Sequence, residues 1–145
     1  MLIYILVIIA LLLSTATETF AKECSAVFKP KITSGLVTRM TLHKFADHYE
    51  LQFLTPSQLP LLDITAAIDG AAQKVFLAGG LDDELFTITD EENGIAVSRK
   101  TLDALAKGKE LEVKGRGSDD KAESAVFALK DFGAKLKKMP KGCGK

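Results

Sequence analysis

Residues 36–54, Leu-Val-Thr-Arg-Met-Thr-Leu-His-Lys-Phe-Ala-Asp-His-Tyr-Glu-Leu-Gln-Phe-Leu, decide the fold class of this chain. Polar and apolar side chains alternate over residues 48–54, as in a half-buried strand, and residues 36–45 are rich in β-branched and apolar types. A turn at residues 46–47 would join the two strands into a hairpin. The apolar side chains expected on its buried face are Leu36, Met40 and Leu42 in the first strand and Tyr49, Leu51 and Phe53 in the second.

Short apolar runs separated by turn residues continue along the chain. Asp69-Gly70 and Asn93-Gly94 are dipeptides typical of tight turns. The further strands expected from these runs are residues 61–68, 74–78, 84–89, 109–114 and 124–130. A polar loop is expected over residues 115–123. The core candidates in these strands are Ile64, Ala66, Ile68, Leu111, Val113, Val126 and Leu129.

Two helices are expected in the C-terminal half. Residues 98–108 carry apolar side chains at helical spacing, with Ser98 as the N-cap and Gly108 as a C′ stop. A shorter helix is expected after Asp131, which would cap it, and this helix would end at Pro140. Its apolar side chains are Phe132, Leu136 and Met139. The pattern predicts an α+β fold, a mostly antiparallel β sheet or sandwich of short strands with two short helices.

The N-terminus has the pattern of an export signal. Residues 2–13 are uncharged and apolar, and twelve helical residues span about 18 Å, short of the roughly 30 Å of a membrane core. The small residues Thr19 and Ala21 favour cleavage after Ala21. We therefore expect a signal peptide over residues 1–21 and a single exported domain over residues 22–145. One feature departs from the signal-peptide pattern, because no Lys or Arg precedes the apolar run. The alternative is an uncleaved N-terminal anchor, in which the apolar segment extends through Ala16 and has a marginal length for spanning.

The only two cysteines, Cys24 and Cys143, lie near the two ends of the exported domain. An even number of cysteines in an exported chain favours a disulfide. Chain termini are often close together in a folded domain, which favours this pairing. Free thiols and an intermolecular bridge remain the alternatives, and no Cys-x-x-Cys motif is present to indicate redox chemistry.

Charge is balanced overall but uneven along the sequence. The chain has 19 basic and 19 acidic residues, so bulk electrostatic capture of nucleic acid is not expected. From Lys130 onward there are six Lys and one Asp. The candidate contacts with an anionic lipid surface or a polyanionic glycan are Lys137, Lys138, Lys141 and Lys145. The alternative is that these lysines complement a helix dipole in a solvated tail.

The two histidines of the chain are the candidate residues for a metal-binding or hydrolytic site. His43 and His48 flank the expected hairpin turn, and with Asp47 or Glu50 they would form a metal-binding or hydrolytic site. The alternative is two surface imidazoles on a solvated strand. Six acidic residues between positions 82 and 92 lack the order of an EF-hand and fit a charged edge strand better. We expect no catalytic residues, no metal and no cofactor.

The C-terminal half resembles a known family. Residues 94–97 (Gly-Ile-Ala-Val), 102–113 (Leu-Asp-Ala-Leu-Ala-Lys-Gly-Lys-Glu-Leu-Glu-Val) and 126–132 (Val-Phe-Ala-Leu-Lys-Asp-Phe) are similar to invasion-associated locus B proteins, which are exported bacterial proteins of mostly β structure. The chain departs from that pattern at Ile95, where the family usually has a cysteine, and at Asp131, where it has a glycine. The resemblance implies a periplasmic or surface-associated role and no catalytic residues.

These observations together predict a small exported, non-enzymatic domain that acts through its surface as an envelope-associated or host-interaction binding module. The expected partner is a protein or an envelope glycan. Membrane contact is expected to be only peripheral, or through an uncleaved N-terminal segment. The alternative is a hydrolytic or metal-dependent enzyme that uses His43, His48 and nearby carboxylates. The expected location is the periplasm or the extracellular medium.

Overall fold

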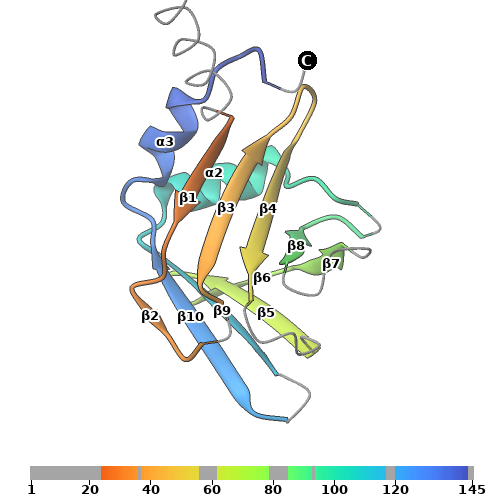
Figure 1. The fold of residues 1–145 in the computed structure, drawn as a ribbon, viewed down its shortest axis with the longest axis vertical. Helices are drawn as coiled ribbons and strands as arrows, with labels where there is room; N and C mark the ends of the chain where they lie inside the picture. The colour runs from red at the N-terminus through yellow and green to blue at the C-terminus, as the bar shows by residue number, and fades with distance from the viewer. Residues whose placement is uncertain are drawn as a thin grey trace, which may run out of the picture.

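The computed structural model describes residues 24–35, 37–55, 62–78, 85–92, 94–116 and 120–143, and the expected signal peptide lies outside these ranges. The described residues form two five-stranded antiparallel sheets and two helices (Figure 1). The first sheet, sheet A, has the order β1 (Ser25–Phe28), β3 (Arg39–Lys44), β4 (Tyr49–Leu54), β8 (Leu85–Thr89) and β7 (Phe76–Ala78). The second, sheet B, has the order β2 (Ile32–Thr33), β10 (Ala122–Ala128), β9 (Glu110–Arg116), β5 (Leu62–Ile68) and β6 (Ala71–Gln73). The α+β, mostly antiparallel fold predicted from the sequence is confirmed.

The β3–β4 hairpin is the centre of sheet A, as its alternation predicts. Leu42 lies opposite Leu51, and Met40 lies opposite Phe53. Paired residues of antiparallel strands share a face, so all four side chains point into the core. Each of the four is at most 4% exposed. Leu36, the remaining expected core residue of the first strand, lies outside the described residues.

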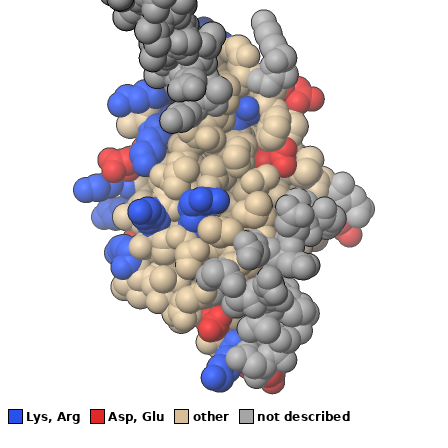
Figure 2. Space-filling model, in the orientation of Figure 1, with Lys and Arg blue, Asp and Glu red and all other residues tan. Residues whose placement is uncertain are grey.

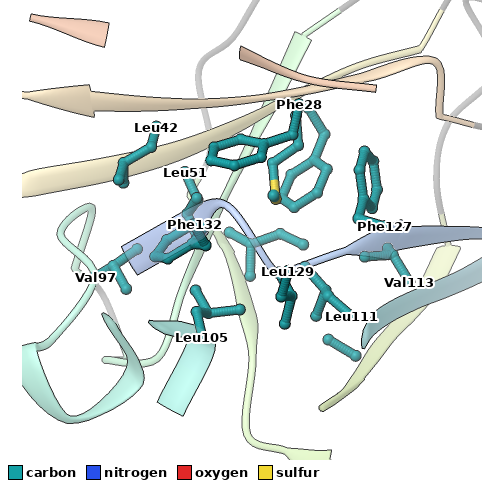
Figure 3. Packing of buried hydrophobic residues seen from close by; sticks show 14 of the residues in the cluster. Phe28, Leu42, Leu51, Val97, Leu105, Leu111, Val113, Phe127, Leu129 and Phe132 are labelled. Atoms are coloured by element: carbon teal, nitrogen blue, oxygen red, sulfur yellow. The ribbon is translucent and has the colours of Figure 1, made fainter. Parts of the chain in front are cut away.

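Both sheets and helix α2 (Arg99–Lys107) share a hydrophobic core (Figure 3). Phe53 of sheet A stacks on Phe86 and meets the ring of Phe127 from sheet B edge-on, with 6.0 Å between the latter two ring centroids. Leu105 of α2 is also fully buried in this cluster. Sheet B and α2 therefore cover one face of sheet A, while its other face, the front of Figure 1, is not part of the core.

Helix α2 begins after Ser98 and ends before Gly108, as the sequence predicts, but Gly108 has a different role from the one expected. The Ser98 side chain accepts a hydrogen bond from the backbone N–H of Thr101. The Asp90 carboxylate accepts hydrogen bonds from the hydroxyl groups of Ser98 and Thr101. Gly108 is not a left-handed C′ residue, because its φ of −76° is ordinary for any residue. A Cβ atom there would lie 2.7 Å from Cγ2 of Ile68. Gly108 is therefore required for space between α2 and sheet B.

Helix α3 (Phe132–Lys138) confirms the expected C-terminal helix, but Asp131 does not cap it with its side chain. Asp131 has helical backbone angles, so its carboxylate is not placed to accept from the first turn. The helix is held instead by apolar contacts. Phe132 is fully buried and stacks on Phe28 of β1, with ring centroids 5.2 Å apart. Met139, just after the helix, is 7% exposed.

Several strand predictions need correction. The strand expected over 74–78 is present as β7, which begins only at Phe76, and the preceding strand β6, in the other sheet, was not expected. The loop expected over 115–123 is shorter, because β9 continues to Arg116 and β10 begins at Ala122. Val126 does not lie on the core face of β10, whereas Ala125 and Phe127 do; Leu129, just after the strand, is buried as expected. Strands β1 and β2 were not expected from the sequence.

The Asp69-Gly70 turn is present and has a second use. Both residues have positive φ, 50° and 81°. Positive φ at both central residues is typical of the two-residue hairpin turn whose twist matches that of the flanking strands. The Asp69 carboxylate also accepts hydrogen bonds from the backbone N–H groups of Lys109 and Glu110. The β5–β6 turn is thereby joined to the beginning of β9.

Candidate functional site: the groove between β1 and α3

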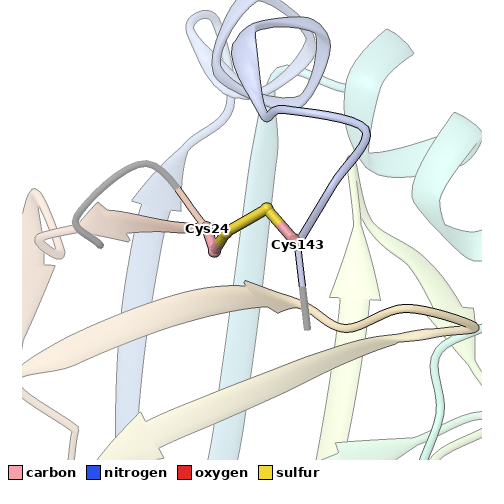
Figure 4. The surroundings of a disulfide bond; sticks show 2 residues. All are labelled: Cys24 and Cys143. Atoms are coloured by element: carbon pink, nitrogen blue, oxygen red, sulfur yellow. A yellow bond between two sulfur atoms is a disulfide. The ribbon is translucent and has the colours of Figure 1, made fainter. Parts of the chain in front are cut away.

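A disulfide joins the two ends of the described chain (Figure 4). Cys24 and Cys143 are 119 residues apart in sequence, and their Cα atoms are 5.6 Å apart. Cys24 directly precedes β1, and Cys143 follows α3 by five residues. The bridge expected from the sequence is therefore present, and it ties the beginning of β1 to the segment that leaves α3.

Strand β1 has a neighbour, β3, on one side only within the described part of the chain. The backbone carbonyl of Cys24 accepts a hydrogen bond from the N–H of Lys44, so it faces β3. Backbone groups of successive residues in a strand point in alternate directions. The N–H and C=O groups of Ser25 and Val27 therefore point away from β3, toward the open edge.

Helix α3 lies beside this open edge and leaves a groove between them. The groove has a volume of about 570 Å³ and is open to solvent, and its lining residues are Ser25, Ala26, Val27, Lys135, Lys138 and Met139. Stacking of Phe132 on Phe28 holds α3 against the core-facing side of β1. One wall is thus strand backbone and the other is a helix side that carries two ammonium groups.

Lys135 makes the most specific contact in the groove. Its ammonium group donates a hydrogen bond to the outward-pointing carbonyl of Val27, with an N–O distance of 3.0 Å. The same group lies 4.6 Å from the centroid of the Phe28 ring, within the range of a cation–π interaction. Lys135 is exposed, so a ligand can reach its ammonium from solvent.

The basic character predicted for the C-terminus is concentrated near this groove. Lys137, Lys138 and Lys141 are exposed, and Lys145 lies outside the described residues. Lys138 lines the groove, whereas Lys137 and Lys141 do not. Figure 2 shows Lys and Arg gathered on the side of the molecule where Figure 1 places α3 and β1. Sequence reasoning missed Lys135, because its contact with Val27 spans 108 positions.

The two histidines lie on the outer side of the β3–β4 hairpin. His43 is paired across the strands with Glu50, while His48 contacts Asp47 and Glu50 directly. Nδ1 of His48 lies 2.6 Å from Asp47, and Nε2 lies 2.9 Å from Glu50. These two carboxylates raise the pKa of His48, the bond to Asp47 contributing most, and the same bond lowers the pKa of Asp47. Phe45 stacks on the imidazole, with ring centroids 4.8 Å apart.

This arrangement is that of a closed ion cluster. Both ring nitrogens of His48 face carboxylates, which favours the doubly protonated imidazolium as a donor at each end. A metal ligand or a general base needs a nitrogen with a free lone pair. No group of three or more His, Cys, Asp or Glu side chains placed to hold a metal occurs among the described residues.

Of the six acidic residues between positions 82 and 92, the structure describes Asp90, Glu91 and Glu92. Residues 82–84 lie outside the described ranges, and Asp90 is bound to the beginning of α2. Burial by itself raises the pKa of Asp90, but hydrogen bonds from Ser98 and Thr101 outweigh it and lower the pKa. Asp90 is thus part of a helix-capping arrangement.

The space between the sheets and α2 is small. A cavity of about 30 Å³ is lined mainly by core side chains such as Leu51, Ile88 and Leu111. That volume is comparable to one water molecule, so it has no room for an organic ligand. The groove between β1 and α3 is much larger than this cavity.

No protein-family model, curated protein or solved structure matches this chain. Within the described ranges, none of the helices has the length and apolar character needed to cross a membrane. The groove is therefore interpreted from its own geometry and charge.

Proposed function

We propose that this protein is a small exported, non-enzymatic binding domain that recognises an anionic partner at the groove between β1 and α3. The observation that carries the proposal is the pair Lys135 and Lys138 beside an open strand edge. Exposed ammonium groups that line a groove attract anionic ligands and accelerate their association. The disulfide supports the proposal by tying both walls of the groove together.

The proposed location is the periplasm or the extracellular medium. The Cys24–Cys143 disulfide supports export, because such bridges persist in oxidising compartments. The resemblance of residues 94–132 to invasion-associated locus B proteins supports an envelope-associated or host-interaction role. Intact mass of the exported protein tests cleavage: a mature N-terminus at Lys22 is expected, and a full-length mass in the membrane fraction would instead favour the anchor.

Binding of exported protein to isolated cell envelopes tests the proposal. The test variant is K135Q/K138Q, and the matched control is K100Q/K114Q, which removes the same charge at exposed positions outside the groove. We expect the test variant to lose about thirtyfold in affinity at low salt, since each of the two lysines near an anionic surface contributes about 1 kcal/mol. Equal loss in both variants would show that net charge alone, and not the groove, governs association.

The enzymatic alternative has its own test. The double variant H43A/H48A removes both imidazoles from the outer side of the hairpin and leaves the groove unchanged. Retained envelope binding by a folded double variant is the result expected for the proposed binding domain. Loss of a hydrolytic activity present in the wild-type protein would favour the enzyme that uses His43, His48 and the neighbouring carboxylates.

A further inference from the structure

We propose that the β1–α3 groove binds an extended acidic peptide segment, which adds to the β1 edge as a sixth strand of sheet A. The inference rests on the proposed function and specifies its partner and binding mode. In strand addition, main-chain hydrogen bonds supply affinity, and alternate side chains supply specificity. Both components can be located in the groove.

The main-chain component comes from Ser25 and Val27. Their N–H and C=O groups point to the open edge, so a peptide can form up to four backbone hydrogen bonds there. The Val27 carbonyl already has a donor, the Lys135 ammonium. A peptide N–H would take over this carbonyl and release the ammonium of Lys135 to pair with an acidic side chain of the peptide.

The side-chain component follows from the two faces of the sheet. Peptide residues on the core-facing side of sheet A would approach α3, where Lys135 and Lys138 favour carboxylates. Peptide residues on the outer side would lie next to Val27, which is 45% exposed. β-branched side chains pack well against such a neighbour across strands. The groove therefore selects alternation of acidic and β-branched residues.

Two other occupants fit the geometry less well. An anionic membrane is a broad surface, whereas the outward backbone groups of Ser25 and Val27 face a groove between β1 and α3. Lipid headgroups would not provide an ordered row of N–H donors for these backbone groups. A second copy of this chain, paired through the same β1 edge, would bring the Lys135 and Lys138 groups of both copies together. Like charges in such close apposition oppose pairing.

The probe is a seven-residue peptide, blocked at both ends, with glutamate at odd positions and valine or threonine at even positions. The matched control peptide has the same sequence with alternate backbone nitrogens methylated, so that its charge is kept and strand pairing is lost. Calorimetric titration of the exported protein is expected to show saturable binding of the first peptide and at least about tenfold weaker binding of the second, equivalent to about 1.4 kcal/mol.

Variants of the protein separate this inference from the proposed function. V27P removes an outward N–H that β3 does not use, and proline is tolerated on edge strands. We expect V27P and K135Q/K138Q each to weaken peptide binding about tenfold, and K100Q/K114Q to leave it unchanged. The methylated peptide tests the same hydrogen bonds in the wild-type protein, so the result does not depend on folding of V27P.

Other outcomes overturn the inference. Equal binding of the two peptides would exclude strand addition, and the proposed function would still stand if K135Q/K138Q lost affinity. Binding to vesicles of phosphatidylglycerol and phosphatidylcholine, with no peptide binding, would replace the peptide by a lipid surface. If K135Q/K138Q bound every probe as well as the wild type did, the proposed function itself would be wrong.

Discussion

Removal of the Cys24–Cys143 disulfide is expected to lower the free energy of unfolding by up to about 5 kcal/mol. A cross-link reduces the entropy of the unfolded chain, and a loop of about 100 residues corresponds to about 4.7 kcal/mol at 25 °C. The bridge here closes a loop with a sequence separation of 119. Since folded domains are stabilised by only about 5–15 kcal/mol in total, this loss is large.

The folded structure gives the reason why the loss should arise mainly in the unfolded state. Phe132 is fully buried against Phe28, and Met139 is 7% exposed, so apolar contacts keep α3 docked without the bridge. Alanine is the appropriate replacement, because Cys143 is 2% exposed and a buried serine hydroxyl would need a hydrogen-bond partner.

Urea unfolding of the wild type and of C24A/C143A provides the measurement. The expected result is a lower midpoint for the variant, with no further effect of reductant on the variant and a comparable decrease for the reduced wild type. A larger slope is also expected, because the unlinked chain exposes more surface on unfolding. A variant whose free energy of unfolding lies within about 1 kcal/mol of the oxidised wild type would refute the reasoning.

Three further predictions concern positions outside the groove. G108A should lower the free energy of unfolding by about 2 kcal/mol in urea unfolding, because the added methyl group would collide with Ile68; an unchanged midpoint would contradict this close approach. D90N should lower the free energy of unfolding by about 2 kcal/mol at pH 7, because the hydrogen bonds that the charged Asp90 carboxylate accepts at the beginning of α2 are weakened. Since the pKa of Asp90 is lowered, this contribution should be present above its ordinary pKa of 3.8 and be lost as the pH falls through the lowered value. The raised pKa of His48 gives the opposite pH dependence. The contribution of the His48 ion cluster to the free energy of unfolding is complete below the ordinary pKa of 6.5 and is lost as the pH rises through the raised pKa. H48Q should therefore flatten the fall in melting temperature as the pH rises above the ordinary value of 6.5, and identical pH profiles would exclude the ion cluster as a source of stability.

The elements predicted best are those whose pattern is local. Alternation of polar and apolar residues in the β3–β4 hairpin places Leu51 and Phe53 in the core without reference to the rest of the chain. Strand β10 is different, because Val126 and Phe127 are adjacent and both apolar. Pairing with β9 decides between them: Phe127 lies opposite Leu111, and this register brings Phe127 into the core and Val126 to the other face.

Features that depend on distant parts of the chain were not predictable in this way. Gly108 looks like an ordinary helix stop, and only the approach of Ile68 shows why a side chain cannot be accommodated there. Strand β1 has four residues and too little pattern of its own to be recognised. The sequence indicated a basic C-terminal segment, but the selection of Lys135 depends on its contact with the Val27 carbonyl.

The most direct test of the central claim is to map the binding site on the protein by nuclear magnetic resonance. Isotopically labelled, oxidised protein recovered after export would be titrated with the glutamate-containing peptide while backbone amide signals are followed. The account predicts that the largest shifts occur at Ser25, Val27 and the residues of α3, with the amide protons of Ser25 and Val27 becoming protected from exchange with solvent. Largest shifts at the β3–β4 hairpin around His48, or shifts spread evenly over the basic residues without such protection, would contradict it.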